Sequence, residues 1–305
     1  MTEQQRRLPG TGIEVNGLTR RYGEVLAADR VSFTVPPGTM TGFVGANGAG
    51  KTTTMRMIVG VLAISAGTVS FDGRPITAAD RRRIGYMPEE RGLYPKQPII
   101  DQLVYLARIR GVSAQAAQQQ AMGYLERFGL ADRAKDKVEK LSLGNQQRVQ
   151  VTAALLGDPV ALILDEPFSG LDPVAVDAMA EVLRRSSAAG VPVLFSSHQL
   201  DLVEKLCDRL VILDHGRVVA HGSTEELRGS GPRRHRLSAS VDLGWLRGVR
   251  GVDVVDLDGT SAVLQFTEPG ADQTVLAETM RRGEVLEFAR IVPSLSEIYR
   301  EAAAS

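Results

Sequence analysis

The stretch of residues 45–52 has the residue types and the spacing of a loop that binds phosphate. Its sequence, Gly45-Ala46-Asn47-Gly48-Ala49-Gly50-Lys51-Thr52, matches the pattern G-x-x-x-x-G-K-[ST] at every fixed position. Glycines let such a backbone curl so that its N–H groups face an anion, while the lysine reaches the β- and γ-phosphates of a nucleotide. The threonine hydroxyl is of the kind that ligates Mg²⁺. We therefore predict a nucleotide site, against the alternative of a glycine-rich turn that binds nothing.

Two adjacent carboxylates follow a continuous apolar run, residues 160–164, which we expect to be a buried strand. Burying the carboxylates of Asp165 and Glu166 at the end of such a strand costs free energy unless a cation or hydrogen bonds compensate their charge. We assign Asp165 to Mg²⁺, directly or through water, and Glu166 to orienting or deprotonating an attacking water. His198 stands just past another apolar strand, 191–196. A lone histidine is usually structural, but ligands gather at such strand ends in open α/β sheets, which favours a site role.

A further anion site is possible where the run Leu141-Ser142-Leu143-Gly144-Asn145-Gln146-Gln147-Arg148 opens a predicted helix that continues to Leu156. Ser142 and Gly144 leave backbone N–H groups facing outward at the helix start. The same residues are also consistent with a capped helix and nothing more. Asp172 precedes the next predicted helix, 173–189.

Two features upstream of these motifs have two interpretations each. Tyr22 follows residues 13–19, whose alternation we interpret as an edge strand, and its ring could stack on a purine base or be an ordinary half-buried tyrosine. The loop 87–95 contains Glu89 and exposes Leu93 and Tyr94. Such a loop indicates either a docking surface or a local tuck into the core.

Strands and helices alternate up to about residue 229, which predicts an α/β domain over residues 1–229. Within it, apolar residues spaced for helices over 99–110 and 113–128 indicate a helical insert at about 97–158, and we expect Ser113 to cap the second of these helices. Gly229-Ser230-Gly231-Pro232 marks a boundary. Residues 230–305 then read as a small α+β domain without a cysteine pair, histidine cluster or glycine loop, so we expect it to be regulatory or to support a dimer.

Composition restricts the partners of the chain. Its 305 residues include 36 basic and 36 acidic ones, and this balance gives no electrostatic footprint for nucleic acid. Cys207 is the single cysteine and lies among apolar residues, so we expect a buried, reduced thiol. No stretch reaches the roughly 18 apolar residues that span a bilayer, and the start lacks a signal core. We expect a soluble protein whose membrane role, if any, comes through a partner.

Several motifs in the same order resemble the nucleotide-binding subunits of ABC transporters. The resemblance covers roughly residues 13–229 and rests on residues 45–52, 141–145, 162–166 and 169–172, and on His198. It implies a P-loop ATPase fold with a mostly parallel core sheet, an antiparallel β subdomain and a helical subdomain. The loop 88–95 and the C-terminal domain look like the branch that serves ABC-2 type exporters, including sodium-efflux and drug- or peptide-export ATPases.

The resemblance also implies roles for single residues. ATP would lie between the phosphate loop of one subunit and the Ser142–Gly144 segment of another, in a homodimer or in a heterodimer with a related ATPase subunit. Tyr22 would stack on adenine, Lys51 and Thr53 would hold phosphates, and Thr52 with Asp165 would hold Mg²⁺. Glu166 would polarise water, His198 would contact the γ-phosphate, Asp172 would lie in the loop that crosses the dimer, and Glu89 would sense Mg²⁺ and the membrane partner.

The chain departs from this family at two motifs. Glu89 stands where the family usually has glutamine; a carboxylate accepts a hydrogen bond from Mg²⁺-bound water but cannot donate one. The signature usually reads Leu-Ser-Gly-Gly-Gln, and Leu143 and Asn145 replace its first glycine and its glutamine. We assign the γ-phosphate contact to Ser142 and Gly144, and none to Leu143.

We therefore predict an ATP-hydrolysing subunit that drives a membrane-spanning permease of an ABC-2 type exporter, held at the inner face of the cell membrane from the cytoplasm. The alternative from another class is a soluble ABC ATPase acting on ribosomes or DNA. Proteins of that class usually carry two cassettes or a long coiled-coil insert, and this chain has neither. A P-loop kinase or GTPase would not explain Ser142, Gly144 and His198 together.

Overall fold

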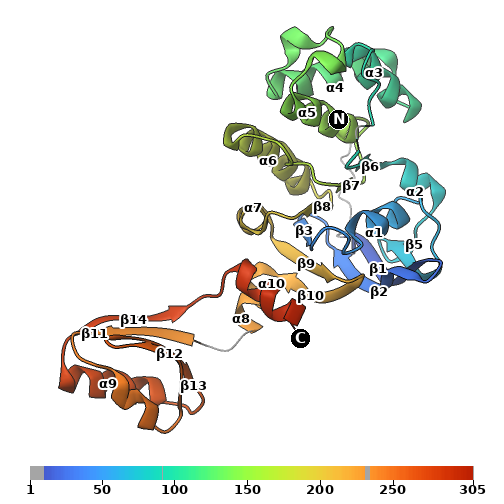
Figure 1. The fold of residues 1–305 in the computed structure, drawn as a ribbon. Helices are drawn as coiled ribbons and strands as arrows, with labels where there is room; N and C mark the ends of the chain where they lie inside the picture. Colours follow the sequence, from blue (N-terminus) through green and yellow to red (C-terminus); the bar gives the residue numbers. More distant parts are fainter. Residues whose placement is uncertain (1–9, 91, 231–233, 305) are drawn as a thin grey trace, which may run out of the picture. The chain divides into compact units, whose positions relative to one another are not determined.

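The computed structural model describes residues 10–90, 92–230 and 234–304. Two compact units make up the chain, Met1–Thr224 and Glu225–Ser305 (Figure 1). Arg91 of the loop 87–95, and Gly231 and Pro232 of the expected boundary, lie outside the described residues. No helix in the described ranges combines the length and the apolar character that a membrane crossing requires.

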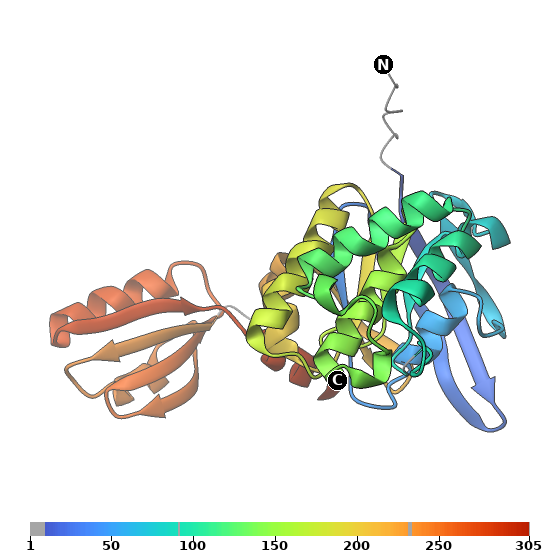
Figure 2. The same ribbon diagram turned by 90° about the horizontal axis from the view of Figure 1, so that it is seen from above.

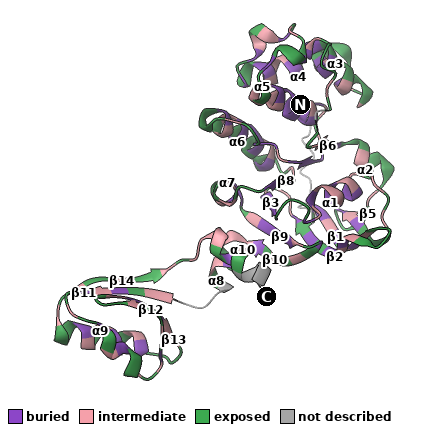
Figure 3. Ribbon diagram, viewed as in Figure 1, coloured by how far each residue is buried: buried purple, intermediate pink, exposed green. Residues whose placement is uncertain are grey.

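A six-stranded sheet forms the centre of the first unit, in the order β10-β9-β3-β8-β7-β6. Its core strands are short and apolar, and β3, β7 and β8 are buried along their whole length (Figure 3). Every neighbouring pair except β9–β10 is parallel, so the prediction of a mostly parallel core sheet is confirmed. The strands span β3 (Met40–Val44), β6 (Ile84–Met87), β7 (Ala161–Leu164), β8 (Val193–Ser197), β9 (Arg209–Asp214) and β10 (Arg217–Ser223).

An antiparallel sheet of four strands, in the order β2-β1-β4-β5, lies in the same unit. It comprises β1 (Ile13–Tyr22), β2 (Val25–Val35), β4 (Ala66–Phe71) and β5 (Arg74–Pro75). The expectation that residues 13–19 form an edge strand is wrong, because β1 pairs with β2 on one side and β4 on the other. Alternation indicates that one face of a strand is buried, as Ile13 and Val15 are here, but it does not indicate whether both edges of the strand are paired.

Helices surround the parallel sheet, and three of them, α3, α4 and α5, form a separate group (Figure 1). Ser113 caps α4 by accepting a hydrogen bond from Ala116 N–H, as its position in the sequence predicts. The sequence reading missed β5, α2 and α7, which are too short to show a period. The helices of this unit are α1 (Lys51–Ile58), α2 (Ala78–Arg82), α3 (Ile99–Ile109), α4 (Ala114–Arg127), α5 (Leu143–Leu155), α6 (Pro173–Ala188) and α7 (Leu200–Leu206).

The second unit contains an antiparallel sheet in the order β12-β13-β11-β14. Helix α9 covers one face of it (Figure 2), and Leu237, Leu264 and Val275 are fully buried in the core between them. This arrangement confirms the predicted α+β class. The unit starts with α8 (Thr224–Ser230), and the elements that follow are β11 (Arg234–Ala239), β12 (Val252–Asp258), β13 (Ser261–Phe266), α9 (Ala271–Arg282), β14 (Val285–Ile291) and α10 (Leu295–Ala304).

Candidate nucleotide-binding site

The phosphate loop connects β3, in the middle of the sheet, to the start of α1. Gly50 precedes the helix with a φ of 101°, and a Cβ at this position would lie 2.3 Å from the Ala27 carbonyl oxygen. A residue other than glycine is therefore excluded both by backbone conformation and by space. Lys51 is only 7% exposed, and its Nζ donates hydrogen bonds to the carbonyls of Gly45 at 2.7 Å and Ala46 at 3.2 Å. The ammonium group is thus held at the loop with a third N–H available to an anion.

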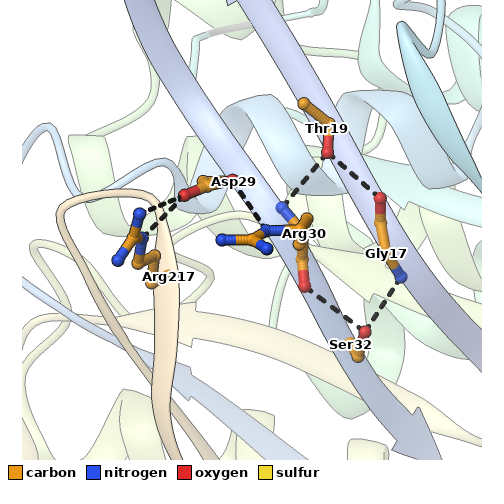
Figure 4. A network of polar contacts seen from close by, with 6 residues as sticks. All are labelled: Gly17, Thr19, Asp29, Arg30, Ser32 and Arg217. Carbon is orange, nitrogen blue, oxygen red and sulfur yellow. Dashed lines mark hydrogen bonds and ion pairs between the residues drawn. The ribbon is translucent and has the colours of Figure 1, made fainter.

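A network of polar contacts holds the phosphate loop against its neighbours. The loop carbonyl of Ala49 accepts from Gly216 N–H at 3.0 Å, and Asp29 N–H donates to the Gly216 carbonyl at 2.8 Å. Arg217 in turn donates to Asp29 Oδ2 from Nε at 2.7 Å, which links β10 to β2 (Figure 4). This hydrogen bond, together with the positive charges of Arg217 and Arg30, holds the pKa of the Asp29 carboxyl below its ordinary value, against the opposing effect of its partial desolvation.

The two carboxylates lie where β7 ends. Asp165 is 1% exposed, and its Oδ1 accepts a hydrogen bond from Ser196 Oγ at 2.6 Å. Its Oδ2 is buried without a hydrogen-bond partner. A buried anionic oxygen in this state requires a counter-charge, and a hard divalent cation fits it. Thr52 lines the same cavity as Asp165 and offers a hydroxyl, so the donor set fits Mg²⁺.

Glu166 has a left-handed backbone, with a φ of 51°, that few residues other than glycine adopt. Its N–H donates to Ser196 Oγ at 2.7 Å, so one serine contacts both members of the carboxylate pair. Its Oε2 lies 3.1 Å from Nδ1 of His198. The Glu166 side chain is 12% exposed and that of His198 is 51% exposed. The pair can therefore orient a water molecule that enters from solvent.

Most residues predicted for the site surround one cavity of about 220 Å³. The predicted residues that line it are Asn47, Gly48, Gly50, Lys51, Thr52, Thr53, Glu89, Asp165 and Glu166. Gly45 supplies a carbonyl to Lys51 beneath the loop. His198 lines a neighbouring cavity of about 250 Å³, which also contains Glu89, Glu166 and Leu143. Side chains suited to phosphate, a divalent cation and water activation thus meet at one end of the sheet.

Besides Gly45, four predicted residues line neither of these two cavities. Tyr22 ends β1, and its ring is covered by the guanidinium of Arg20 at 4.8 Å from the ring centroid. Ser142 caps α5 by accepting from Asn145 N–H, and Gly144 lies in the first turn. Asp172 caps α6 by accepting from Ala175 N–H at 2.8 Å. Tyr22, Ser142 and Asp172 thus each have a structural contact of their own.

Sequence reasoning missed Ser196 and Gln147, which both contact Glu166. Ser196 is fully buried at the end of β8, beside Asp165. The parallel register that pairs Leu164 with Phe195 brings it there. Gln147 Nε2 donates to the Glu166 carbonyl at 2.7 Å. Its only signal in the sequence is its place one turn after Ser142 on a predicted helix.

Comparison with known proteins agrees with this geometry. Residues 28–169 match the family model described as ABC transporter, and residues 222–303 match that of the ATP-binding protein DrrA1-3-like, C-terminal domain. The uncharacterized ABC transporter ATP-binding protein YhaQ of Bacillus subtilis is 41% identical over 95% of this chain and 97% of its own length. The chain belongs to the ABC transporter ATP-binding proteins.

One further relative and one solved structure are also similar to this ABC protein. The Nod factor export ATP-binding protein I of Burkholderia lata is 38% identical over 72% of this chain and 73% of its own length. A solved structure described as the ATP binding subunit of an ABC transporter is 34% identical, with a TM-score of 0.67 over 72% of this chain and 92% of the other. Members of the family hydrolyse ATP, and this chain is an ATPase of the same type.

Proposed function

We propose that this ABC protein hydrolyses ATP to drive a separate membrane-spanning permease, in an exporter of the ABC-2 type. The observation that carries the proposal is the 220 Å³ cavity, where the phosphate loop faces Asp165 and Glu166. The direction of transport is supported by the relative from Burkholderia lata, which is named for export. The protein would then work from the cytoplasm, at the inner face of the membrane.

Each side chain of the cavity has a role in this proposal. The loop N–H groups, Lys51 and Thr53 bind the phosphates of ATP. Thr52 and Asp165 would hold Mg²⁺, which would neutralise charge on the phosphates. Glu89, which lines the same cavity, would accept hydrogen bonds beside the cation.

Hydrolysis would depend on Glu166 and His198, which lie beside these phosphate-binding groups. Glu166 orients the attacking water and takes its proton, and His198, held 3.1 Å from Glu166, contacts the γ-phosphate. Because Glu166 is fixed by its backbone as well as by His198, the carboxylate is placed before the substrate arrives.

The ATP site would be completed by a second subunit. Ser142 and Gly144 begin α5 with outward N–H groups but do not line the cavity of their own chain. In a head-to-tail dimer they would face the γ-phosphate of ATP held by the other subunit, and Asp172 would lie at the crossing between the two. The second subunit is another copy of this chain or a related ATPase subunit.

The permease would dock on the loop 87–95. Tyr94 is 67% exposed there, so its ring is not tucked into the core. Gln102 of α3 fixes the loop by accepting from Tyr94 N–H at 2.8 Å and donating to the Tyr94 carbonyl at 3.0 Å. Beside it lies a hollow of about 510 Å³ that includes Leu93 and Tyr105. We assign the C-terminal unit, residues 225–305, a regulatory or dimer-supporting role.

The first test is a titration of the purified chain with ATP, followed by a phosphate-release assay. Wild-type protein should bind and hydrolyse ATP, whereas Lys51→Ala should lose nucleotide binding. Unchanged ATP affinity of this variant would contradict the assignment of the loop. Light scattering with ATP present then gives the oligomeric state, since a doubled mass indicates a homodimer.

A second test separates transport from the alternative role on ribosomes or DNA. The tagged protein should co-purify from detergent extracts with a membrane protein. Recovery of ribosomes without any membrane protein would instead favour the non-transport class.

A further inference from the structure

Helix α5 carries residues that belong to two different ATP sites. Its first turn presents Ser142 and Gly144, which we have assigned to ATP held by the second subunit. One turn further on, Gln147 donates from Nε2 to the carbonyl oxygen of Glu166 at 2.7 Å, within the same chain. The helix thus lies between the ATP of the other subunit and the catalytic carboxylate of its own.

The backbone of Glu166 depends on contacts from outside its own turn. Its left-handed φ of 51° is unfavourable for a residue with a side chain, so the surrounding structure must hold it. The N–H is held by Ser196 from β8, at 2.7 Å. The carbonyl accepts from Gln147 and, over a longer distance of 3.2 Å, from Ser169 N–H. Gln147 therefore supplies the shorter of the two bonds that fix the carbonyl side of this peptide.

The side chain of Glu166 is sensitive to this backbone. Its Oε2 meets His198 Nδ1 at 3.1 Å, and a rotation of the Glu166 peptide would carry the carboxylate away from that contact. Catalytic groups lose rate when they are displaced by as little as about 1 Å. A shift of α5 would thus reach the carboxylate through a single hydrogen bond.

We propose that Gln147 is a positioning residue for Glu166 and couples the two ATP sites of the dimer. When ATP of the second subunit engages Ser142 and Gly144, it fixes α5, and Gln147 then fixes Glu166 in the other site. Binding at one site therefore favours hydrolysis at the other, so that hydrolysis depends cooperatively on ATP concentration. This inference rests on the dimeric ATPase proposed above.

Gln147→Leu tests the proposal, because leucine has a similar size but no donor. Loss of one hydrogen bond of ordinary strength predicts a kcat lower by roughly three- to tenfold. The Hill coefficient for ATP should fall toward one, with little change in the ATP concentration that gives half of the maximal rate. Gln147→Glu keeps the shape and loses the donor, so it should show the same fall in cooperativity.

Gln120→Leu is a matched control. Gln120 Oε1 on α4 accepts a hydrogen bond from Gly157 N–H at 3.1 Å, so this change also removes a glutamine bond to the backbone, away from the site. It should leave both kcat and the Hill coefficient unchanged. The coupling is refuted if Gln147→Leu retains the wild-type Hill coefficient, if Gln120→Leu matches its effect, or if the wild type hydrolyses ATP with a Hill coefficient of one. Absence of hydrolysis by the wild type would instead refute the ATPase proposal itself.

Discussion

Ser196→Ala removes the side chain that joins the two carboxylates of the site. Its Oγ donates to Asp165 Oδ1 at 2.6 Å and accepts from Glu166 N–H at 2.7 Å, and the residue is fully buried. A hydrogen bond to a charged group contributes about 1.5–3 kcal/mol and a neutral one about 0.5–1.5 kcal/mol. The expected loss in the free energy of unfolding is therefore about 2–4.5 kcal/mol. Urea unfolding followed by far-UV circular dichroism measures it.

The neighbouring Ser197→Ala is the matched control for this change. Ser197 is also buried on β8, but among the described residues its Oγ has a single hydrogen bond, accepted from Gln199 N–H at 3.0 Å. Its removal should cost about 0.5–1.5 kcal/mol. The reasoning is refuted if the two substitutions destabilise the protein equally. Ser196→Ala should also lower kcat, because the Glu166 peptide loses one of its supports.

Three other predictions concern the surroundings of the cavity. Arg20→Ala removes the guanidinium that lies over the Tyr22 ring, so it should weaken ATP binding about two- to fivefold, the range of an exposed cation–π contact. Binding of tripolyphosphate, which has no base, should stay unchanged in calorimetry. Equal losses for both ligands would contradict a role of Tyr22 at the base. Gly50→Ala should destabilise the protein more than Gly48→Ala in urea unfolding. The reason is that a Cβ at Gly50 would lie 2.3 Å from the Ala27 carbonyl oxygen, whereas a Cβ at Gly48 would have no atom within 4 Å. Similar losses of stability for the two variants would show that the clash at Gly50 is relieved. Because the folded pKa of Asp29 is lowered, its ion pair should stabilise the protein above the unfolded value of about 3.9 and lose this effect as pH falls further. The stability difference between wild type and Asp29→Asn should thus narrow below about pH 4 in acid titration, and a constant difference would count against the pair.

The sequence was most informative where the chemistry is local. The phosphate loop, the carboxylates after β7 and the caps at Ser113 and Ser142 are each specified within a few residues, and the structure has strands and helices where these patterns predict them. The role of β1 was mispredicted because pairing on both edges depends on β2 and β4, which lie at other places in the chain.

Residues that act through register could not be found from the sequence. Ser196 is one of two serines at the end of β8, and its contact with Asp165 follows from how β7 and β8 align. Gln147 reaches Glu166 only because α5 packs beside the end of β7. Arg217 donates a hydrogen bond to Asp29 although the two residues are 188 positions apart in the sequence. Such contacts depend on three-dimensional packing, which composition and periodicity do not encode.

The catalytic assignment of Glu166 is tested most directly by phosphate release from Glu166→Gln at saturating ATP. Glutamine keeps the size of the side chain but cannot accept a proton from water, and a general base contributes about 10²- to 10⁴-fold to the rate. The variant should bind ATP as tightly as the wild type and release phosphate at least about 100-fold more slowly. Undiminished phosphate release, with ATP binding intact, would contradict the assignment.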